Sequence, residues 1–216
     1  MRRSRPNGFA YLISPNKIVN KMPKERQNEM NKDNDRTCES SKNPEGRFDL
    51  GVCYLKGLGV GQDLEAASKW FEKAAEAEPD AKDRLMWYKK AAELGDAHSQ
   101  FKVAEALNSG AGGERCESSE AFNRYKVSAE GGDVNAMCEL GNYYLMGLGC
   151  QQDRALGLQW CVKAAEKGFG LAQRMLGNIY SNERNAEYDI NEARKWYQKA
   201  ADQGDDIAKD ELRRLS

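Results

Sequence analysis

The chain has 216 residues, of which 31% are charged and 40% hydrophobic, and its formal net charge is −1. That length allows one large core or a short array of small units, and no apolar run approaches the 18 residues that suggest a membrane-spanning helix. Residues 1–45 carry ten Lys or Arg and six Asp or Glu, a net +4, which leaves −5 for the remainder. A negative charge on the remainder argues against a surface that follows nucleic-acid phosphates, so no nucleic-acid partner is expected.

Residues 1–45 form the first predicted region, a disordered basic tail. They contain too few apolar side chains to offset the entropy lost on folding. The apolar stretch from Phe9 to Ile13 is too short for a signal peptide and ends at Ser14-Pro15. Arginines before the first acidic residue also fit a mitochondrial presequence. We therefore expect a cytoplasmic protein, with a mitochondrial location as the alternative.

From residue 46 onward the chain repeats a pattern of two helices. The first helix carries Leu-Gly-x-x-Tyr or a relic of it, and the i, i+4 spacing puts the Leu and the Tyr on one face. A glycine inside a helix costs about 1 kcal/mol relative to alanine, so its recurrence predicts a close helix crossing where a Cβ would clash. The copies are Leu50-Gly51…Tyr54, Val103-Ala104…Leu107, Leu140-Gly141…Tyr144 and Leu176-Gly177…Tyr180.

A glycine-rich loop follows most copies of the first helix, because glycine permits the positive φ of a tight reversal. The last copy has Ser181 to Tyr188 in this place, which predicts a longer and looser loop. The other loops are Gly57 to Val60, Gly110 to Gly113 and Gly147 to Cys150.

Each second helix carries an aromatic residue at one repeated position. An aspartate seven residues earlier is predicted to cap the helix, and an Ala-Ala pair four residues later lets two helices approach. The aromatic ring is predicted to fill the gap between repeats, and a glycine near residues 95, 132, 168 and 204 is predicted to end the helix. The tryptophans are Trp70, Trp87, Trp160 and Trp196, and a weaker fifth copy places Tyr125 here; from Trp87 onward the steps are 38, 35 and 36 residues.

The spacing predicts the organisation of the array over residues 46–216. Leu50 and Val103 are 53 residues apart, which is about 19 fewer than two periods, so one first helix and its loop are absent. Arg213 stands where the glycine of earlier copies stands, which suits a terminal capping helix. The predicted repeats are 46–78, a half repeat 79–95 with a second helix only, 96–132, 133–168 and 169–204, followed by the cap 205–216.

Together these motifs resemble the Sel-1-like repeat, a branch of the tetratricopeptide-like helical repeats. The densest matches are Trp70-Phe-Glu-Lys-Ala-Ala-Glu76 and Trp196-Tyr-Gln-Lys-Ala-Ala-Asp202. The resemblance implies an all-α fold, a right-handed α/α superhelical solenoid of about four to five helix-turn-helix repeats. It also implies a role similar to that of adaptors that hold partner proteins.

Candidate catalytic groups are few, and no catalytic, cofactor or metal site is predicted. Cys53, Cys138 and Cys161 align with apolar residues of other repeats and are interpreted as core fillers. None of the six cysteines forms a C-x-x-C pair, which argues against zinc and favours a reducing compartment. His98, the only histidine, is interpreted as a solvated helix residue, and the Ser14-x-x-Lys17 match to a β-lactam-binding motif as chance.

Partner binding is predicted on first-helix positions that differ between repeats, since residues shared by every repeat serve the packing. By analogy with tetratricopeptide arrays these line the concave face. We expect a non-enzymatic adaptor for other proteins or peptides, in an unknown oligomeric state; a helical-repeat RNA reader and, less favoured, a β-lactam-binding enzyme are the alternatives. The predicted partner-binding residues are Cys138, Asn142, Met146, Arg174, Asn178 and Asn182.

Overall fold

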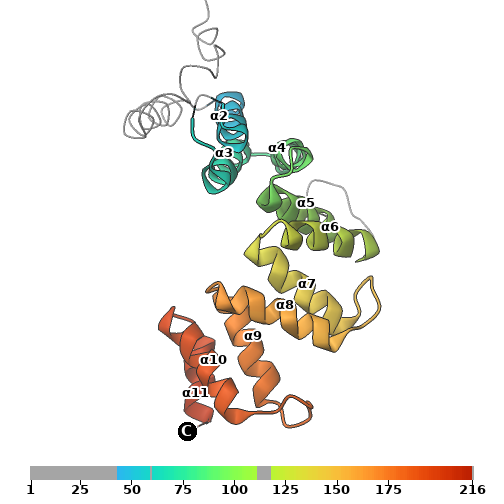
Figure 1. Ribbon diagram of the computed structural model, residues 1–216, viewed down its shortest axis with the longest axis vertical. Coiled ribbons are helices and arrows are strands. Elements are labelled where there is room, and N and C mark those ends of the chain that lie inside the picture. The colour runs from blue at the N-terminus through green and yellow to red at the C-terminus, as the bar shows by residue number, and fades with distance from the viewer. Residues whose placement is uncertain (1–42, 59, 111–117, 216) are drawn as a thin grey trace, which may run out of the picture. The chain divides into compact units, whose positions relative to one another are not determined.

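The computed structural model describes residues 43–58, 60–110 and 118–215, and within these ranges the chain is all α-helix with no strand (Figure 1). This confirms the predicted fold class. The tail predicted over residues 1–45 lies outside the described residues up to residue 42, and the first described helix begins at Pro44. The helices are α2 (Pro44–Lys56), α3 (Leu64–Glu76), α4 (Ala81–Glu93), α5 (Ala97–Ser109), α6 (Ser118–Glu130), α7 (Val134–Met146), α8 (Arg154–Glu166), α9 (Gly170–Ser181), α10 (Ile190–Asp202) and α11 (Asp206–Arg214).

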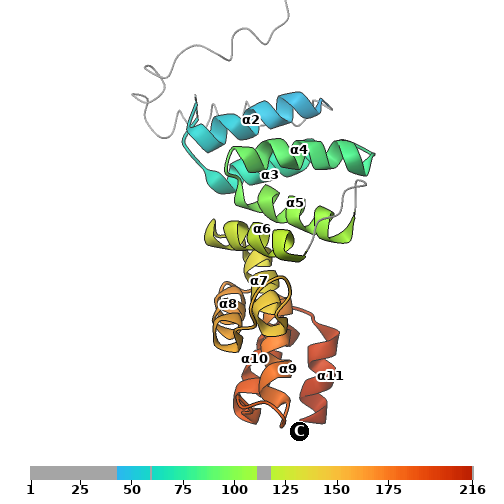
Figure 2. The ribbon, with the colours of Figure 1, turned by 90° about the vertical axis from the view of Figure 1, so that its right-hand side faces the viewer.

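The helices group into two compact units. The N-terminal unit extends to Ala91 and contains α2, α3 and most of α4, and the C-terminal unit begins at Ala92 and contains α5 to α11. Within the C-terminal unit each helix packs on the next one along the chain (Figure 2). First helices of the repeat are α2, α5, α7, α9 and α11; second helices are α3, α4, α6, α8 and α10. In the N-terminal unit α4 follows α3 directly, with no first helix between them.

Local capping explains where these helices begin and end. The Asp63 carboxylate accepts the Ala66 N–H at 2.9 Å, and Asp153 does the same for the Leu156 N–H. Such caps satisfy backbone donors that have no partner inside the helix. The closing glycines adopt the left-handed conformation, with φ of 93° at Gly95 and 90° at Gly168. The aspartate caps and glycine ends predicted from the sequence are therefore confirmed.

The glycine of Leu-Gly-x-x-Tyr marks the predicted close crossing of the two helices of a repeat. A Cβ added to Gly141 would stand 2.5 Å from the Cys161 Sγ and 3.0 Å from the Gly157 carbonyl oxygen. Gly51 and Gly177 meet an aromatic ring in the same way, Phe71 at 2.6 Å and Tyr197 at 2.5 Å. Close crossing is thus confirmed, and the residue that fills the crossing lies directly after the tryptophan position.

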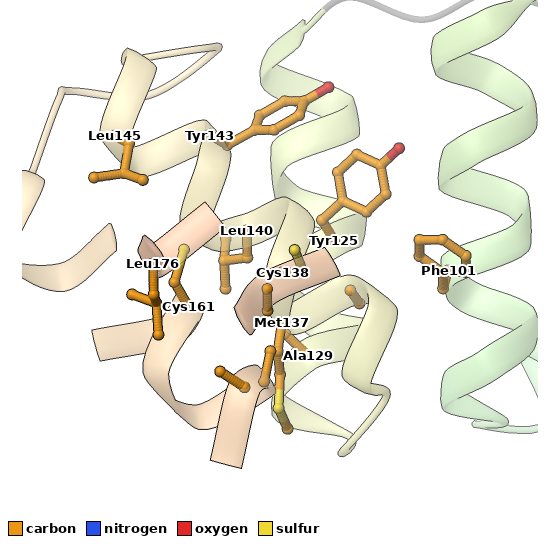
Figure 3. Close-up of a cluster of buried hydrophobic side chains, with 14 of the residues drawn as sticks. Phe101, Tyr125, Ala129, Met137, Cys138, Leu140, Tyr143, Leu145, Cys161 and Leu176 are labelled. Carbon is orange, nitrogen blue, oxygen red and sulfur yellow. The ribbon is translucent and has the colours of Figure 1, made fainter. Parts of the chain in front are cut away.

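The structure corrects the register of the weakest repeat. The thirteen residues of α6 align with those of α3, so Tyr125 takes the position of Phe71 and not that of Trp70. Arg124 occupies the tryptophan position. The steps from Trp87 to Arg124, then to Trp160 and then to Trp196 are therefore regular, at 37, 36 and 36 residues. Tyr125 is buried between Phe101 and Tyr143, whose ring centroids lie 6.0 and 5.2 Å away (Figure 3).

The tryptophans are not equally buried, although the sequence predicts one role for all four. Trp70, Trp87 and Trp196 are at most 8% exposed, whereas Trp160 is only partly buried. The ammonium group of a lysine three residues later lies 4.1–4.2 Å from the ring centroid in every case. The lysine stem therefore covers part of each ring that the neighbouring helices leave open.

The loop between α9 and α10, predicted to be loose, is held by several bonds. The Asn185 amide donates to the Ile179 carbonyl at 2.9 Å, and the Asp189 N–H donates to the Tyr180 carbonyl at 2.9 Å. The Arg154 guanidinium donates three hydrogen bonds of 2.8–3.0 Å to the Glu187 carboxylate. The loop is longer than the α7–α8 loop, as predicted, but the prediction that it is loose is wrong, because these polar groups hold it.

Candidate functional site

The first helices α5, α7 and α9 of the C-terminal unit contact one another through side chains, and each has a face of half-buried or exposed residues. The Tyr143 hydroxyl of α7 donates to the Asn108 side chain of α5 at 3.1 Å, and the Cys138 thiol of α7 contacts the Met175 sulfur of α9 at 3.5 Å. Accessible positions recur at i, i+4, i+7 and i+11, which is one face of a helix. We call this face the first-helix stripe; it consists of His98, Lys102, Glu105 and Ser109 on α5, Asn135, Glu139, Asn142 and Met146 on α7, and Leu171, Met175, Asn178 and Asn182 at α9.

Two of the six residues predicted to bind partners lie outside this stripe. Cys138 is 1% exposed and belongs to the core of the C-terminal unit (Figure 3), so it has no surface to offer a partner, and its assignment is wrong. Arg174, at the equivalent position of α9, is half-buried and its Nε lies 2.7 Å from the Asp205 carboxylate. Both residues contact a neighbouring helix, and their position is one residue earlier than that of Glu139 and Met175 in the stripe.

The other four predicted residues belong to the stripe. Met146 is 67% exposed, Asn142 is half-buried, and Asn178 and Asn182 are exposed. The side-chain amide oxygen of Asn178 accepts a hydrogen bond from the Tyr197 hydroxyl at 2.7 Å. Asn142 has no such bond, because its repeat carries Cys161 where Tyr197 stands. The two aligned asparagines therefore differ: Asn178 forms a bond within its own repeat, whereas Asn142 lacks that bond.

Sequence reasoning missed three charged residues of the stripe: Lys102, Glu105 and Glu139. Glu105 forms an ion pair of 3.4 Å with Lys102 one turn earlier. Burial, together with the nearby charge of Glu105, raises the pKa of Glu139. Alignment gives a signal that could have found them, since Glu105 takes the position of Asn142 and Glu139 that of Lys102.

The described residues offer little catalytic chemistry. Burial raises the pKa of the Cys138 thiol to about 12 and that of Cys161 to about 11, so both are protonated at neutral pH and are poor nucleophiles. In the described part of the chain no three His, Cys, Asp or Glu side chains come together as metal ligands. Nor is any helix there both long and apolar enough to cross a membrane.

His98 is part of a contact between repeats and not the solvated residue that the sequence predicts. Its Nδ1 lies 2.8 Å from the Asp133 carboxylate, which also accepts the Ala136 N–H at the start of α7. Asp205 makes a similar contact at the start of α11: it accepts the Ala208 N–H and pairs with Arg174, which lies three residues after the position equivalent to His98. The cap of one first helix is thereby tied to the preceding first helix.

Paired helices, a crossing glycine and a tryptophan at a fixed period define a tandem helical-repeat protein. The Sel1 repeat family matches residues 44–79, 85–96, 134–169 and 170–205, which is more than half of the chain. The protein therefore belongs to the Sel1 repeat family, as the motifs indicate. Unmatched residues 97–133 contain the repeat in which Ala104 replaces the crossing glycine and Arg124 the tryptophan.

Two curated relatives share this family resemblance over short segments. The chain is 37% identical over 68 residues to the ERAD-associated E3 ubiquitin-protein ligase component HRD3A of Arabidopsis thaliana. It is 27% identical over 138 residues to chitin synthase regulatory factor 3 of Schizosaccharomyces pombe. These matches cover 31% and 63% of the chain but only 10% and 13% of the relatives.

Solved structures agree with the fold. A Sel1 repeat protein from Oxalobacter formigenes superposes with a TM-score of 0.59 at 31% identity, covering 79% of this chain and 75% of that one. A protective antigen of uropathogenic Escherichia coli that displays an SLR fold has a TM-score of 0.57 at 28% identity, covering 80% of this chain and 41% of its own.

Proposed function

We propose that this protein is a non-enzymatic adaptor that binds segments of partner proteins along the first-helix stripe of its C-terminal unit. The observation that carries the proposal is a difference between two kinds of repeat position, those that are constant and those that vary. Tryptophan, crossing glycine and capping aspartate recur and serve the packing, whereas the accessible residues of α5, α7 and α9 differ from repeat to repeat. Variable side chains on a constant scaffold are typical of repeat proteins that bind partners.

The relatives and the chemistry of the stripe support this proposal. One relative is named as a component of a ubiquitin-protein ligase and another as a regulatory factor of chitin synthase, and both names describe action together with other proteins. Met146 is two-thirds exposed and Met175 lies half-buried at the equivalent side of α9. Methionine is common at adaptable binding surfaces, because its unbranched side chain adjusts to a partner.

Affinity capture with matched methionine variants tests the proposal. The full chain, Met146→Ser and Met86→Ser are immobilised, and captured proteins are quantified by mass spectrometry. Met86 is 43% exposed on the second helix α4 and serves as the control. We expect a set of proteins that Met146→Ser loses and Met86→Ser keeps. Equal capture by all three chains contradicts the proposed surface.

Two further experiments test the alternative functions. Salt-sensitive recovery of RNA by the full chain would favour the RNA reader, since phosphate contacts weaken steeply with salt. Turnover of a chromogenic β-lactam by the pure protein would favour the enzyme.

For the compartment, we propose the cytoplasm, with the mitochondrion as the alternative. Imaging of the protein with a fluorescent tag at one terminus, and separately at the other, distinguishes the two.

A further inference from the structure

Glu139 is the residue of the first-helix stripe whose environment is least suited to its charge. It lies half-buried in the middle of α7, flanked along the stripe by Asn135 and Asn142. Burial removes water from the carboxylate, and the neighbouring Glu105 adds a like charge, so both effects oppose ionisation. Within the part of the chain that the structure describes, no cation pairs with it, since Lys102 pairs with Glu105.

Residues around Glu139 give the surface a polar and an apolar half. Glu105 of α5 lies on one side, and its side chain is 55% exposed beside Lys102. Met146 lies two turns further along α7 on the same stripe and is 67% exposed. The stripe therefore offers the carboxylates of Glu139 and Glu105 and, two turns further along α7, an exposed apolar side chain.

Resting on the proposed function, we propose that this stripe binds a peptide segment whose Lys or Arg side chain pairs with Glu139 and whose neighbouring apolar side chain packs on Met146. Charge complementarity selects this occupant, because a cation supplies the counter-charge that Glu139 lacks. An acidic segment or a nucleic-acid phosphate meets repulsion at the same place.

Selection from a random twelve-residue phage-displayed peptide library on the full chain tests this proposal. We expect the enriched peptides to carry Lys or Arg at a fixed distance from an apolar residue. Their affinity, measured by fluorescence polarisation, falls about tenfold or more in Glu139→Gln, as expected for a charge-assisted hydrogen bond. Glu65→Gln, which removes an 80% exposed carboxylate from α3, is the matched control and leaves the affinity unchanged.

The melting temperature of the free protein separates a binding role from a structural one. Glu139→Gln is expected to melt at or above the wild-type temperature at pH 7, because it removes a charge that burial and Glu105 disfavour. A variant that melts lower while losing peptides overturns the proposal, since the acid would then support the fold.

The peptides also separate this inference from the proposed function. Enriched peptides that lose affinity in Met146→Ser but not in Glu139→Gln overturn the basic-residue inference and leave the adaptor surface standing. Peptides insensitive to both changes, or the absence of enriched peptides, count against both. Enrichment of acidic peptides overturns the inference directly.

Discussion

At the scale of single residues, one position decides how the two helices of a repeat cross. The residue after the tryptophan position meets the crossing glycine, and it is an aromatic ring in most repeats but Cys161 in the repeat of α7 and α8. The smaller thiol lets Gly157 lie close to Gly141. A Cβ added to Gly157 would stand 2.9 Å from the Gly141 carbonyl oxygen. Gly141, Gly157 and Cys161 thus form the crossing that Gly177 and the Tyr197 ring form in the repeat of α9 and α10.

Burial predicts that the tryptophans contribute unequally to stability. Trp196→Ala should lower the free energy of unfolding by about 3–5 kcal/mol, the range for a buried tryptophan that leaves a cavity. Trp160→Ala should cost clearly less, because its ring is only partly buried and water already reaches it. Urea unfolding followed by circular dichroism measures both. Equal losses would mean that the tryptophan position has one role irrespective of burial.

At the scale of secondary-structure elements, the loop between α9 and α10 shows how polar bonds replace glycine. In the α7–α8 loop the Leu148 N–H donates to the Tyr143 carbonyl, at the end of the helix. In the α9–α10 loop the Asn185 side chain donates to the equivalent carbonyl of Ile179. The Arg154–Glu187 pair then fastens this loop to the start of α8.

The Arg154–Glu187 pair predicts a pH-dependent contribution to stability. Hydrogen bonds from Arg154 hold the pKa of Glu187 below its usual value of 4.5, so the pair stabilises the fold above that value and is lost as the pH falls through the lower folded-state pKa. Arg154→Gln should lower the unfolding free energy at pH 7 by about 1 kcal/mol or less, as both groups are partly exposed.

Urea titrations at pH 7 and at pH 3 measure this contribution. The difference between wild type and Arg154→Gln should shrink at the lower pH, where Glu187 begins to take up a proton. Lys69→Gln removes an exposed i, i+4 pair with Glu65 and should change stability little at either pH. A difference that stays constant between the two pH values would show that Arg154 acts by packing and not by charge.

How far the sequence predicts the molecule follows from the range of each interaction. Caps and ends depend on neighbours a few residues away, so Asp63 and Gly95 could be placed from the sequence. The rotation of a first helix depends on what packs against it, which is why the sequence predicts Cys138 as a partner-binding residue although Glu139 is the more accessible neighbour. Arg154 and Glu187 are 33 residues apart and outside any repeated motif, so no local sequence pattern predicts their contact.

At the scale of the whole molecule, the two compact units have separate cores. The core of the N-terminal unit gathers around Leu50, Tyr54, Trp70 and Phe71. The core of the C-terminal unit is a larger cluster that runs from Phe101 to Leu176 and Trp196. In repeat proteins each element contacts its neighbours only, so a local loss of packing spreads through nearest-neighbour contacts and weakens with each step.

The separate cores predict that damage to one unit stays in that unit. Trp70→Ala removes a ring that is 4% exposed and should cost about 3–5 kcal/mol within the N-terminal unit. Hydrogen exchange measured by mass spectrometry should show α2 and α3 losing protection while α7 to α10 keep theirs. Leu64→Ala, which truncates a 61% exposed side chain of the same helix, is the control and should leave both regions protected. A parallel loss of protection in α7 to α10 would instead mean that the two units unfold in one cooperative transition.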